Sequence, residues 1–263
     1  MHVEKVTDYI VNWLKDYAEK AGINGFVVGV SGGIDSAVTS TLCSKTGLKT
    51  ICVSMPIHQA QNQVTRADEQ IAFLEENYSN VSSEKVNLTT VFEEFKAQVP
   101  SSENRALYDL SLANTRARLR MTTLYYIAGI NSALVVGTGN KIEDFGVGFY
   151  TKYGDGGVDI SPIADLLKSE VYALAKHLQV PQSIQSAPPT DGLFGDNRTD
   201  EDQIGASYDE LEWAMKMDEN QVDTAGFSKR QQEVFAIYTR LNSANQHKMN
   251  PIPVCTIPET LRG

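Results

Sequence analysis

The stretch GFVVGVSGGIDSA at residues 25–37 is the part of the sequence that decides the fold. A continuous apolar run ends at Val30, two adjacent glycines follow, and Asp35-Ser36 opens a helical pattern. Glycines let backbone N–H groups approach a ligand closely, and the N-terminus of a helix favours anions. The sequence therefore predicts a phosphate-binding loop between a buried strand and a helix.

Apolar runs and helical patterns alternate along the first half of the chain. The predicted strands are 26–30, 50–56, 85–88 and 131–140, and the predicted helices are 3–20, 35–47 and 62–77. This order indicates the α/β class, with a doubly wound parallel sheet covered by helices on both faces. Ligands bind beyond the carboxyl ends of such strands, so we expect the SGG loop and the GTGN turn at 137–140 to share one site.

The second half of the chain is helical and interrupted by a long loop. Residues 105–130 form a helical pattern that is apolar on more than one face, which fits a core helix or a subunit interface equally well. The Pro- and Gly-rich segment 186–205 is long enough to predict a lid, and the acid-rich run 196–212 predicts a solvated surface. Further helices are expected near 207–218 and 228–244.

Composition narrows the class of protein. The chain has 263 residues and a formal net charge of −10, which argues against a general nucleic-acid binder but allows a small anionic ligand in a basic cleft. Three cysteines form no CxxC pair, and neither a signal peptide nor a membrane span is apparent. We therefore expect a cytoplasmic protein whose residues 1–263 form a single domain.

Common loop motifs fit the opening stretch poorly, with one exception. A Walker loop needs a lysine, and none lies between Gly25 and Lys45; a GxGxxG fingerprint is also absent. The nucleophile pattern GxSxG does fit residues 29–33, and a serine hydrolase could then use His177 or His247 with Asp159. This hypothesis predicts covalent labelling of Ser31 and no need for ATP.

The six residues SGGIDS at 31–36 resemble the SGGxDS loop of the N-type ATP pyrophosphatases, or PP-loop enzymes, which split ATP between its α- and β-phosphates. Serine hydroxyls and successive N–H groups can form a nest for pyrophosphate. A carboxylate at the same place can hold Mg²⁺. The loop predicts ATP as co-substrate but leaves the second substrate open.

Four segments extend the resemblance to the NAD synthetase family over nearly the whole chain. They are ANTRARLRM (113–121), the GT-turn and TKYGDG series (137–175), PPTDGL (188–193) and the HK pair (247–248). The resemblance implies a PP-loop fold similar to the adenine nucleotide alpha hydrolases. It also implies a ligase in which nicotinic acid adenine dinucleotide (deamido-NAD) is adenylated by ATP, and ammonia then displaces AMP to give NAD.

The same resemblance implies roles for individual residues. ATP would be bound by Gly29, Val30, Ser31, Gly32, Gly33, Ile34, Asp35, Ser36, Thr138, Lys168 and Thr190, with Asp35 and Lys168 as the catalytic pair. Mg²⁺ would be bound by Asp35 and Glu143, although Asp144 could exchange roles with Glu143. The dinucleotide would be bound by Arg118, Lys152, Asp159, His247 and Lys248.

The nitrogen source and the assembly are further expectations from the resemblance. The synthetase core begins by about residue 25, so we expect no N-terminal glutaminase domain and direct use of ammonia. A homodimer with the dinucleotide at the interface is also expected. Two alternatives stay open: another PP-loop ATP pyrophosphatase that amidates a different substrate, and a nucleotide sensor without turnover.

Overall fold

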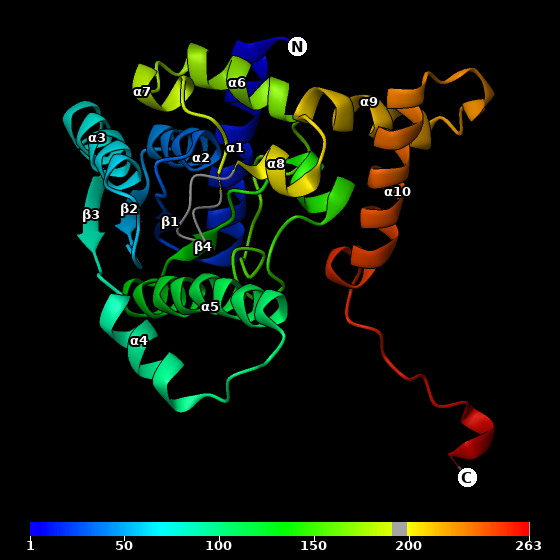
Figure 1. Ribbon diagram of the computed structural model, residues 1–263. Coiled ribbons are helices and arrows are strands. Elements are labelled where there is room, and N and C mark those ends of the chain that lie inside the picture. Colours follow the sequence, from blue (N-terminus) through cyan, green and yellow to red (C-terminus); the bar gives the residue numbers. More distant parts are fainter. Residues whose placement is uncertain (191–198, 263) are drawn as a thin grey trace.

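The computed structural model describes residues 1–190 and 199–262 and is built around a parallel sheet (Figure 1). Its four strands lie in the order β3-β2-β1-β4. They are β1 (Gly25–Gly29), β2 (Lys49–Ser54), β3 (Val81–Lys85) and β4 (Leu134–Val136). Val27 of β1 lies opposite Ile51 of β2 and Val135 of β4, and both pairings are parallel. The expected α/β class is confirmed.

Helices account for most of the remaining described chain. They are α1 (Val3–Ala21), α2 (Ile34–Lys45), α3 (Gln61–Asn77), α4 (Thr89–Gln98), α5 (Arg105–Asn131), α6 (Lys168–His177), α7 (Gln182–Gln185), α8 (Asp200–Ile204), α9 (Tyr208–Glu219) and α10 (Lys229–Met249). Three further segments are not α-helical: η1 (Ile142–Val147) is a π-helix, and η2 (Thr224–Gly226) and η3 (Glu259–Leu261) are 3-10 helices. No helix in the described part of the chain is both long enough and apolar enough to span a bilayer.

Helices cover both faces of the sheet. Neighbouring residues of a strand point to opposite faces, and here the residues on each face pack into a core. Phe26 and Val28 of β1 join the core that α1, α2 and α6 form on one face. Val27, between them, joins the core on the α5 face with Phe92 of α4. All three side chains are fully buried. The doubly wound arrangement predicted from the sequence is therefore present.

A third core lies beyond the carboxyl edge of the sheet. Here η1 packs against α9 and α10 through buried apolar side chains such as Ile142, Leu211 and Val234. The packing places Tyr208, at the start of α9, in hydrogen-bond contact with Glu143 of η1. This unit contributes side chains to the site described below.

The prediction for the third strand was wrong. Residues 85–88 were expected to form it, whereas β3 covers Val81–Lys85 and pairs with β2. β3 lies at the edge of the sheet and is largely exposed, so a polar sequence suffices there. The apolar side chains that suggested a strand, Val86 and Leu88, instead pack on the α5-side core as the chain turns into α4.

The long helix α5 is buried along one side only. Its inner face includes Ala117 and Ile127, whereas Leu107, Tyr126 and Ile130 on other faces are 58%, 68% and 67% exposed. The core-helix interpretation thus accounts for one face of α5 and leaves exposed apolar side chains elsewhere on the helix. From Asn250 onward the chain leaves the body of the molecule in an extended conformation (Figure 1).

Candidate functional site

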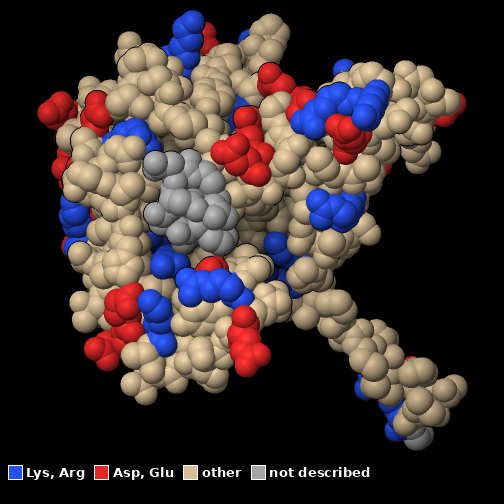
Figure 2. Space-filling model, in the orientation of Figure 1, with Lys and Arg blue, Asp and Glu red and all other residues tan. Residues whose placement is uncertain are grey.

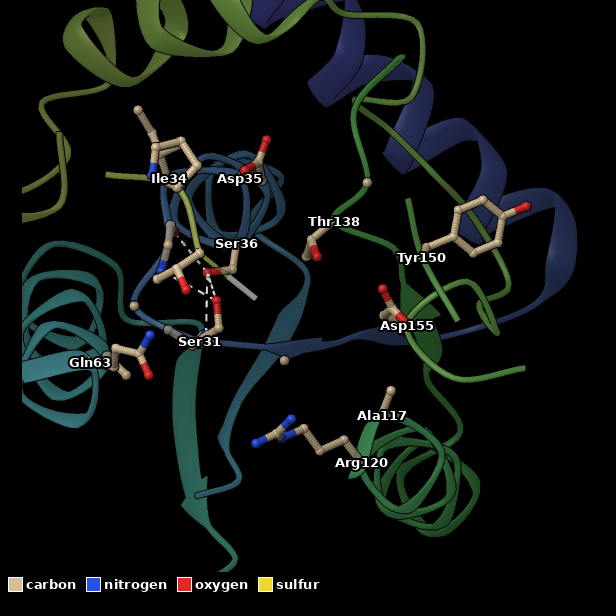
Figure 3. Close-up of a pocket in the computed structure, with 18 of the residues that line it drawn as sticks. Ser31, Ile34, Asp35, Ser36, Gln63, Ala117, Arg120, Thr138, Tyr150 and Asp155 are labelled. Atoms are coloured by element: carbon tan, nitrogen blue, oxygen red, sulfur yellow. Dashed lines mark hydrogen bonds between the residues drawn. The ribbon is translucent and has the colours of Figure 1, made fainter. Parts of the chain in front are cut away.

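A cavity of about 270 Å³ opens at the carboxyl edge of the sheet. Many of the residues expected to bind ATP or metal line it: Gly29, Val30, Ser31, Gly32, Gly33, Ile34, Asp35, Ser36, Thr138, Glu143, Lys168 and Thr190. They come from four separate segments, and Figure 3 shows Ser31, Asp35, Ser36 and Thr138 around the same space. The two Gly-rich turns therefore share one site, as the strand order predicted.

The SGG loop is held in place by its own hydroxyl groups. The Oγ atoms of Ser31 and Ser36 lie 3.1 Å apart, and the Ser36 hydroxyl also donates to the Gly33 carbonyl at 2.9 Å. Gly32 has a φ of +84°, and a Cβ there would lie 2.5 Å from the Gln63 carbonyl oxygen. A side chain at this position would therefore be strained by both backbone conformation and contact.

The centre of the site is a cluster of charged and polar side chains that we call the inner cluster: Asp35, Glu143, Lys168, Asp200 and Tyr208. The Nζ atom of Lys168 lies 2.5 Å from Oδ2 of Asp35 and 3.0 Å from Oε1 of Glu143. Only 3% of the Lys168 side chain is exposed. Burial would lower the pKa of Lys168, but the charges of Asp35 and Glu143 and their hydrogen bonds raise it above its ordinary value. Lys168 is therefore a permanent cation bridging two acids.

Two members of the inner cluster come from the run that was predicted to be a solvated surface. That prediction was wrong for Asp200 and Tyr208, which are 6% and 5% exposed. The Tyr208 hydroxyl donates to Oε1 of Glu143 at 2.6 Å and lies 3.4 Å from Oδ2 of Asp200. Burial and these carboxylates raise the pKa of Tyr208, so the phenol keeps its proton and remains a donor.

The sequence does carry a signal for the starts of α8 and α9, the helices that contain Asp200 and Tyr208. Thr199 with Asp202 and Ser207 with Glu210 form capping boxes at the starts of α8 and α9. The S/T-x-x-D/E spacing predicts helix N-termini at these points. It does not predict which side chains of those helices reach the cavity.

Asp144 also lines the cavity, beside Glu143. Its carboxyl group rests on Gly139, where a Cβ would lie 2.2 Å from Oδ1 of Asp144. Burial, followed by the charge of Glu143, raises the pKa of Asp144 to about 8. Lys168 bonds to Glu143 rather than to Asp144 in the contacts of the described residues, which supports Glu143 as the partner of Asp35.

The donor set suits a divalent cation that is shared with a ligand. No cluster of three or more His, Cys, Asp or Glu side chains in residues 1–190 and 199–262 forms a metal site of its own. Asp35 and Glu143 nevertheless converge on one ammonium, which stands where a cation could bridge both carboxylates. Mg²⁺ is commonly held by one or two carboxylates together with water and substrate phosphates. The pair fits that arrangement.

The residues expected to bind the dinucleotide lie outside the cavity lining. Four of them form what we call the outer group: Arg118, Lys152, His247 and Lys248. Arg118 donates to the Lys152 carbonyl at 3.3 Å, and Lys152 Nζ donates to the His247 carbonyl. Lys248 Nζ donates to the carbonyls of Gly148 and Tyr150 at 2.7 and 2.8 Å. The outer group thus joins α5, the loop after η1 and the end of α10.

Asp159, the fifth of these residues, is separate from the outer group. It accepts hydrogen bonds from the Tyr125 hydroxyl at 3.0 Å and from the Val135 N–H of β4 at 2.8 Å. These two hydrogen bonds tie the loop before Ile160, which forms a β-bridge with Val136, to β4 and α5. Of the predicted lid, Thr190 lines the cavity, whereas residues 191–198 lie outside the described residues.

Arg120 is a cavity residue that sequence reasoning missed. Its guanidinium donates to the Met55 carbonyl at 3.0 Å and to Oε1 of Gln59 at 2.8 Å. In Figure 3 its side chain extends from α5 into the cavity. Figure 2 shows further Lys and Arg side chains over α5 on the same face, despite the net charge of −10. Arg120 lies two positions after Arg118 in the same ARLRM motif, so the motif alone could not separate them.

The serine hydrolase hypothesis finds no support in the site. Ser31 pairs with Ser36 and Gly33, and no histidine is among the described residues that line the cavity. A nucleophilic serine needs a base within hydrogen-bond reach.

A Gly-rich loop between strand and helix, at the carboxyl edge of a doubly wound sheet and beside a lysine–carboxylate cluster, defines a nucleotide-binding α/β protein. The NAD synthase family model matches residues 6–252. The chain therefore belongs to the NAD synthase family, as the sequence resemblance implied.

Individual relatives are similar to this chain over most or nearly all of its length. The NH(3)-dependent NAD(+) synthetase of Carboxydothermus hydrogenoformans is 38% identical over 233 residues, which cover 87% of this chain and 92% of that protein. The NMN synthetase of Francisella tularensis is 31% identical, with a TM-score of 0.82 and coverage of 98% and 99%. The NH3-dependent NAD synthetase of Campylobacter jejuni is 26% identical, with a TM-score of 0.78 and coverage of 97% and 100%.

Proposed function

We propose that this protein is a ligase that makes NAD from nicotinic acid adenine dinucleotide, ATP and ammonia. A carboxylate oxygen of the dinucleotide attacks the α-phosphorus of ATP, and pyrophosphate leaves. Ammonia then attacks the acyl carbon, AMP leaves, and the nitrogen gives up a proton. Adenylation is needed because a carboxylate is a poor electrophile until one of its oxygens becomes part of a good leaving group.

The observation that carries this proposal is the inner cluster beside the SGG loop. Charge accumulates on the phosphates during attack at the α-phosphorus, so catalysis calls for cations and oriented dipoles rather than a protein nucleophile. Lys168 supplies a buried cation, and Ser31, Ser36 and the loop N–H groups supply dipoles. These features favour a role in adenylyl transfer over that of a passive nucleotide sensor.

We assign the ATP site to residues 29–36 with Thr138, Lys168 and Thr190, which share one cavity. Lys168 is the catalytic cation in this assignment. Asp35 and Glu143 are the residues that would hold Mg²⁺. When bound, this ion would neutralise part of the charge on the phosphates of ATP.

We assign the dinucleotide to the outer group and Asp159. Arginine and lysine side chains there would balance its pyrophosphate, and Asp159 would accept hydroxyl or amide hydrogens. Because the outer group lies outside the cavity lining, the reacting carboxylate must reach from one region to the other.

A second copy of the chain is part of the proposal. Exposed apolar side chains on α5, such as those of Leu107, Tyr126 and Ile130, support a homodimer in which the dinucleotide lies near the interface. We also propose that residues 1–263 act as one synthetase domain in the cytoplasm, and that free ammonia is the nitrogen donor. We assign no catalytic role to any of the three cysteines, two of which, Cys43 and Cys52, are buried.

Product analysis tests the function. The purified protein is incubated with ATP, Mg²⁺, ammonium and nicotinic acid adenine dinucleotide, and each component is omitted in turn. NAD together with equal amounts of AMP and pyrophosphate is the expected result. Formation of ADP and phosphate would contradict the assignment of the SGGIDS loop itself.

A second candidate is amidation of the corresponding mononucleotide. It is supported by the similarity of the whole chain to the Francisella tularensis protein named NMN synthetase. The two functions share the adenylation chemistry and differ in the substrate half that lies away from the reacting carboxylate. Parallel assays with nicotinic acid mononucleotide and with the dinucleotide, compared by kcat/KM, separate the two.

A further inference from the structure

Asn140 occupies a central and fully buried position in the site. It ends the GTGN turn that follows β4, and its side chain has no exposed surface. In the sequence, Asn140 stands out only as the last residue of that turn. A buried amide must satisfy both its donor and its acceptor side, so its partners are informative.

Both sides of the Asn140 amide are used, and each side reaches a different carboxylate-bearing segment. Nδ2 donates to Oδ1 of Asp35 at 3.0 Å. Oδ1 accepts from the N–H groups of Ile142 and Glu143 at 3.1 and 3.2 Å. Since backbone N–H groups can only donate, they fix which side of the amide is oxygen.

The amide therefore links two acids that are far apart in the sequence. Asp35 is in the first turn of α2, and Glu143 is in the first turn of the π-helix η1. With Oδ1 of Asp35 engaged by Asn140, Oδ2 faces Lys168. With the N–H of Glu143 engaged by Asn140, its carboxylate reaches the same lysine. Single-turn π-helices are often found at functional sites.

We propose that Asn140 is a positioning residue that sets the separation of the Asp35 and Glu143 carboxylates and thereby the affinity of the site for the divalent cation of ATP. The inference rests on the proposed function, in which these two acids hold that cation. An amide suits this task because it donates on one side and accepts on the other. Aspartate would lose the donor and place a second negative charge against Asp35.

Two substitutions separate positioning from a simple structural role. Asn140→Ser keeps a hydroxyl oxygen that can cap the turn at Ile142 and Glu143, but it is too short to donate to Asp35 in the same way. Asn140→Ala loses both. The matched control is Asn80→Ala, because Asn80 also bridges two segments, through the Ser44 and Leu48 carbonyls, at the opposite end of the strands.

The readout is the affinity for Mn²⁺ in the presence of saturating ATP, measured by electron paramagnetic resonance, beside the affinity for ATP in EDTA. We expect Asn140→Ser and Asn140→Ala to weaken Mn²⁺ binding about tenfold and to change metal-free ATP binding less than twofold. Asn80→Ala should leave the Mn²⁺ affinity unchanged. Thermal unfolding shows whether each variant is folded.

The outcomes distinguish this inference from the proposed function. A folded Asn140→Ser with the parental Mn²⁺ affinity would overturn the positioning role, and so would equal losses of Mn²⁺ and metal-free ATP binding. If the parent binds no Mn²⁺ with ATP, both the inference and the metal assignment are wrong. If Mn²⁺ binding responds as expected but no pyridine nucleotide is amidated, only the proposed function fails.

Discussion

The inner cluster and the outer group differ in how the fold holds them. In the inner cluster, side chains bond to side chains: Lys168 to Asp35 and Glu143, and Tyr208 to Glu143. In the outer group, the long cationic side chains bond mainly to backbone carbonyls, as Arg118 does to that of Lys152. Carbonyl bonds leave the positive charges without acidic partners among these contacts. The inner cluster is therefore prepared before ligand arrives, whereas the outer group has charge to offer to an anion.

The largest expected effect is the loss of the inner cation. Lys168→Met should destabilise the fold by about 3 kcal/mol, because it leaves two mostly buried carboxylates facing each other without a counter-charge. It should also abolish release of pyrophosphate from ATP. Chemical denaturation measures the first effect and a coupled pyrophosphate assay the second.

The control for this variant is Lys176→Met, which changes an exposed lysine of the same helix α6. It should leave both readouts at their parental values. A Lys168→Met protein as stable as the parent would mean that the inner cluster is not held by its charges. The contrast with the outer group would then disappear.

How much of this contrast the sequence could predict depends on how local each feature is. The SGG loop was predictable because a strand, two glycines and a helix start are adjacent in the chain. Asp35, Glu143 and Lys168 were predictable only through the order of motifs in a family. The contacts of Tyr208 and Asn140 join residues 65 and 105 positions apart and depend on how η1 and α9 pack, which no local pattern encodes.

The third strand was missed for a related reason. Apolar periodicity reports burial, and β3 is an exposed edge strand whose pairing is set by the backbone of β2. For Arg118 and Arg120, the motif supplies two arginines, and only the three-dimensional structure shows that Arg120 lines the cavity.

Removing the Tyr208 hydroxyl should have a smaller effect on the inner cluster than removing the charge of Lys168. Tyr208→Phe keeps the ring but deletes the donor to Glu143, so we expect a loss of about 1.5–3 kcal/mol in stability, the usual range for a hydrogen bond to a charged group. Urea unfolding of parent and variant measures the difference. Tyr238→Phe is the control, because Tyr238 is buried in the same core at 2% exposure. Equal losses of stability in both variants would show that the hydrogen bond from Tyr208 to Glu143 contributes no more than any buried tyrosine hydroxyl.

The outer group should respond in binding rather than in stability. We expect Arg118→Ala to weaken the dinucleotide by about 1–3 kcal/mol with little effect on ATP, because it deletes one charge-assisted contact. Stability should change little, since Arg118 is exposed. Isothermal titration calorimetry with each ligand separates these effects. Equal losses for ATP and the dinucleotide would place Arg118 with the inner cluster instead.

The smallest effect concerns the α9–α10 unit, which carries Tyr208 of the inner cluster at one end and His247 and Lys248 of the outer group at the other. Arg230 of α10 donates to both carboxylate oxygens of Glu210 of α9 at 2.7 Å. The hydrogen bond from Arg230 lowers the pKa of Glu210 from 4.5 to about 2. Because the folded-state pKa is depressed, this pair stabilises the fold above pH 4.5 and loses its effect as the pH falls towards 2.

Glu210→Gln should therefore lower the melting temperature slightly at neutral pH, and the difference from the parent should vanish near pH 2. The effect is small because solvent screens a partly exposed pair. If the two regions are coupled through this unit, the variant should also weaken dinucleotide binding slightly at pH 7 while leaving metal-free ATP binding unchanged. A stability difference that persists at pH 2 would mean that the glutamine disturbs the start of α9, where Glu210 completes a capping box with Ser207, rather than the ion pair.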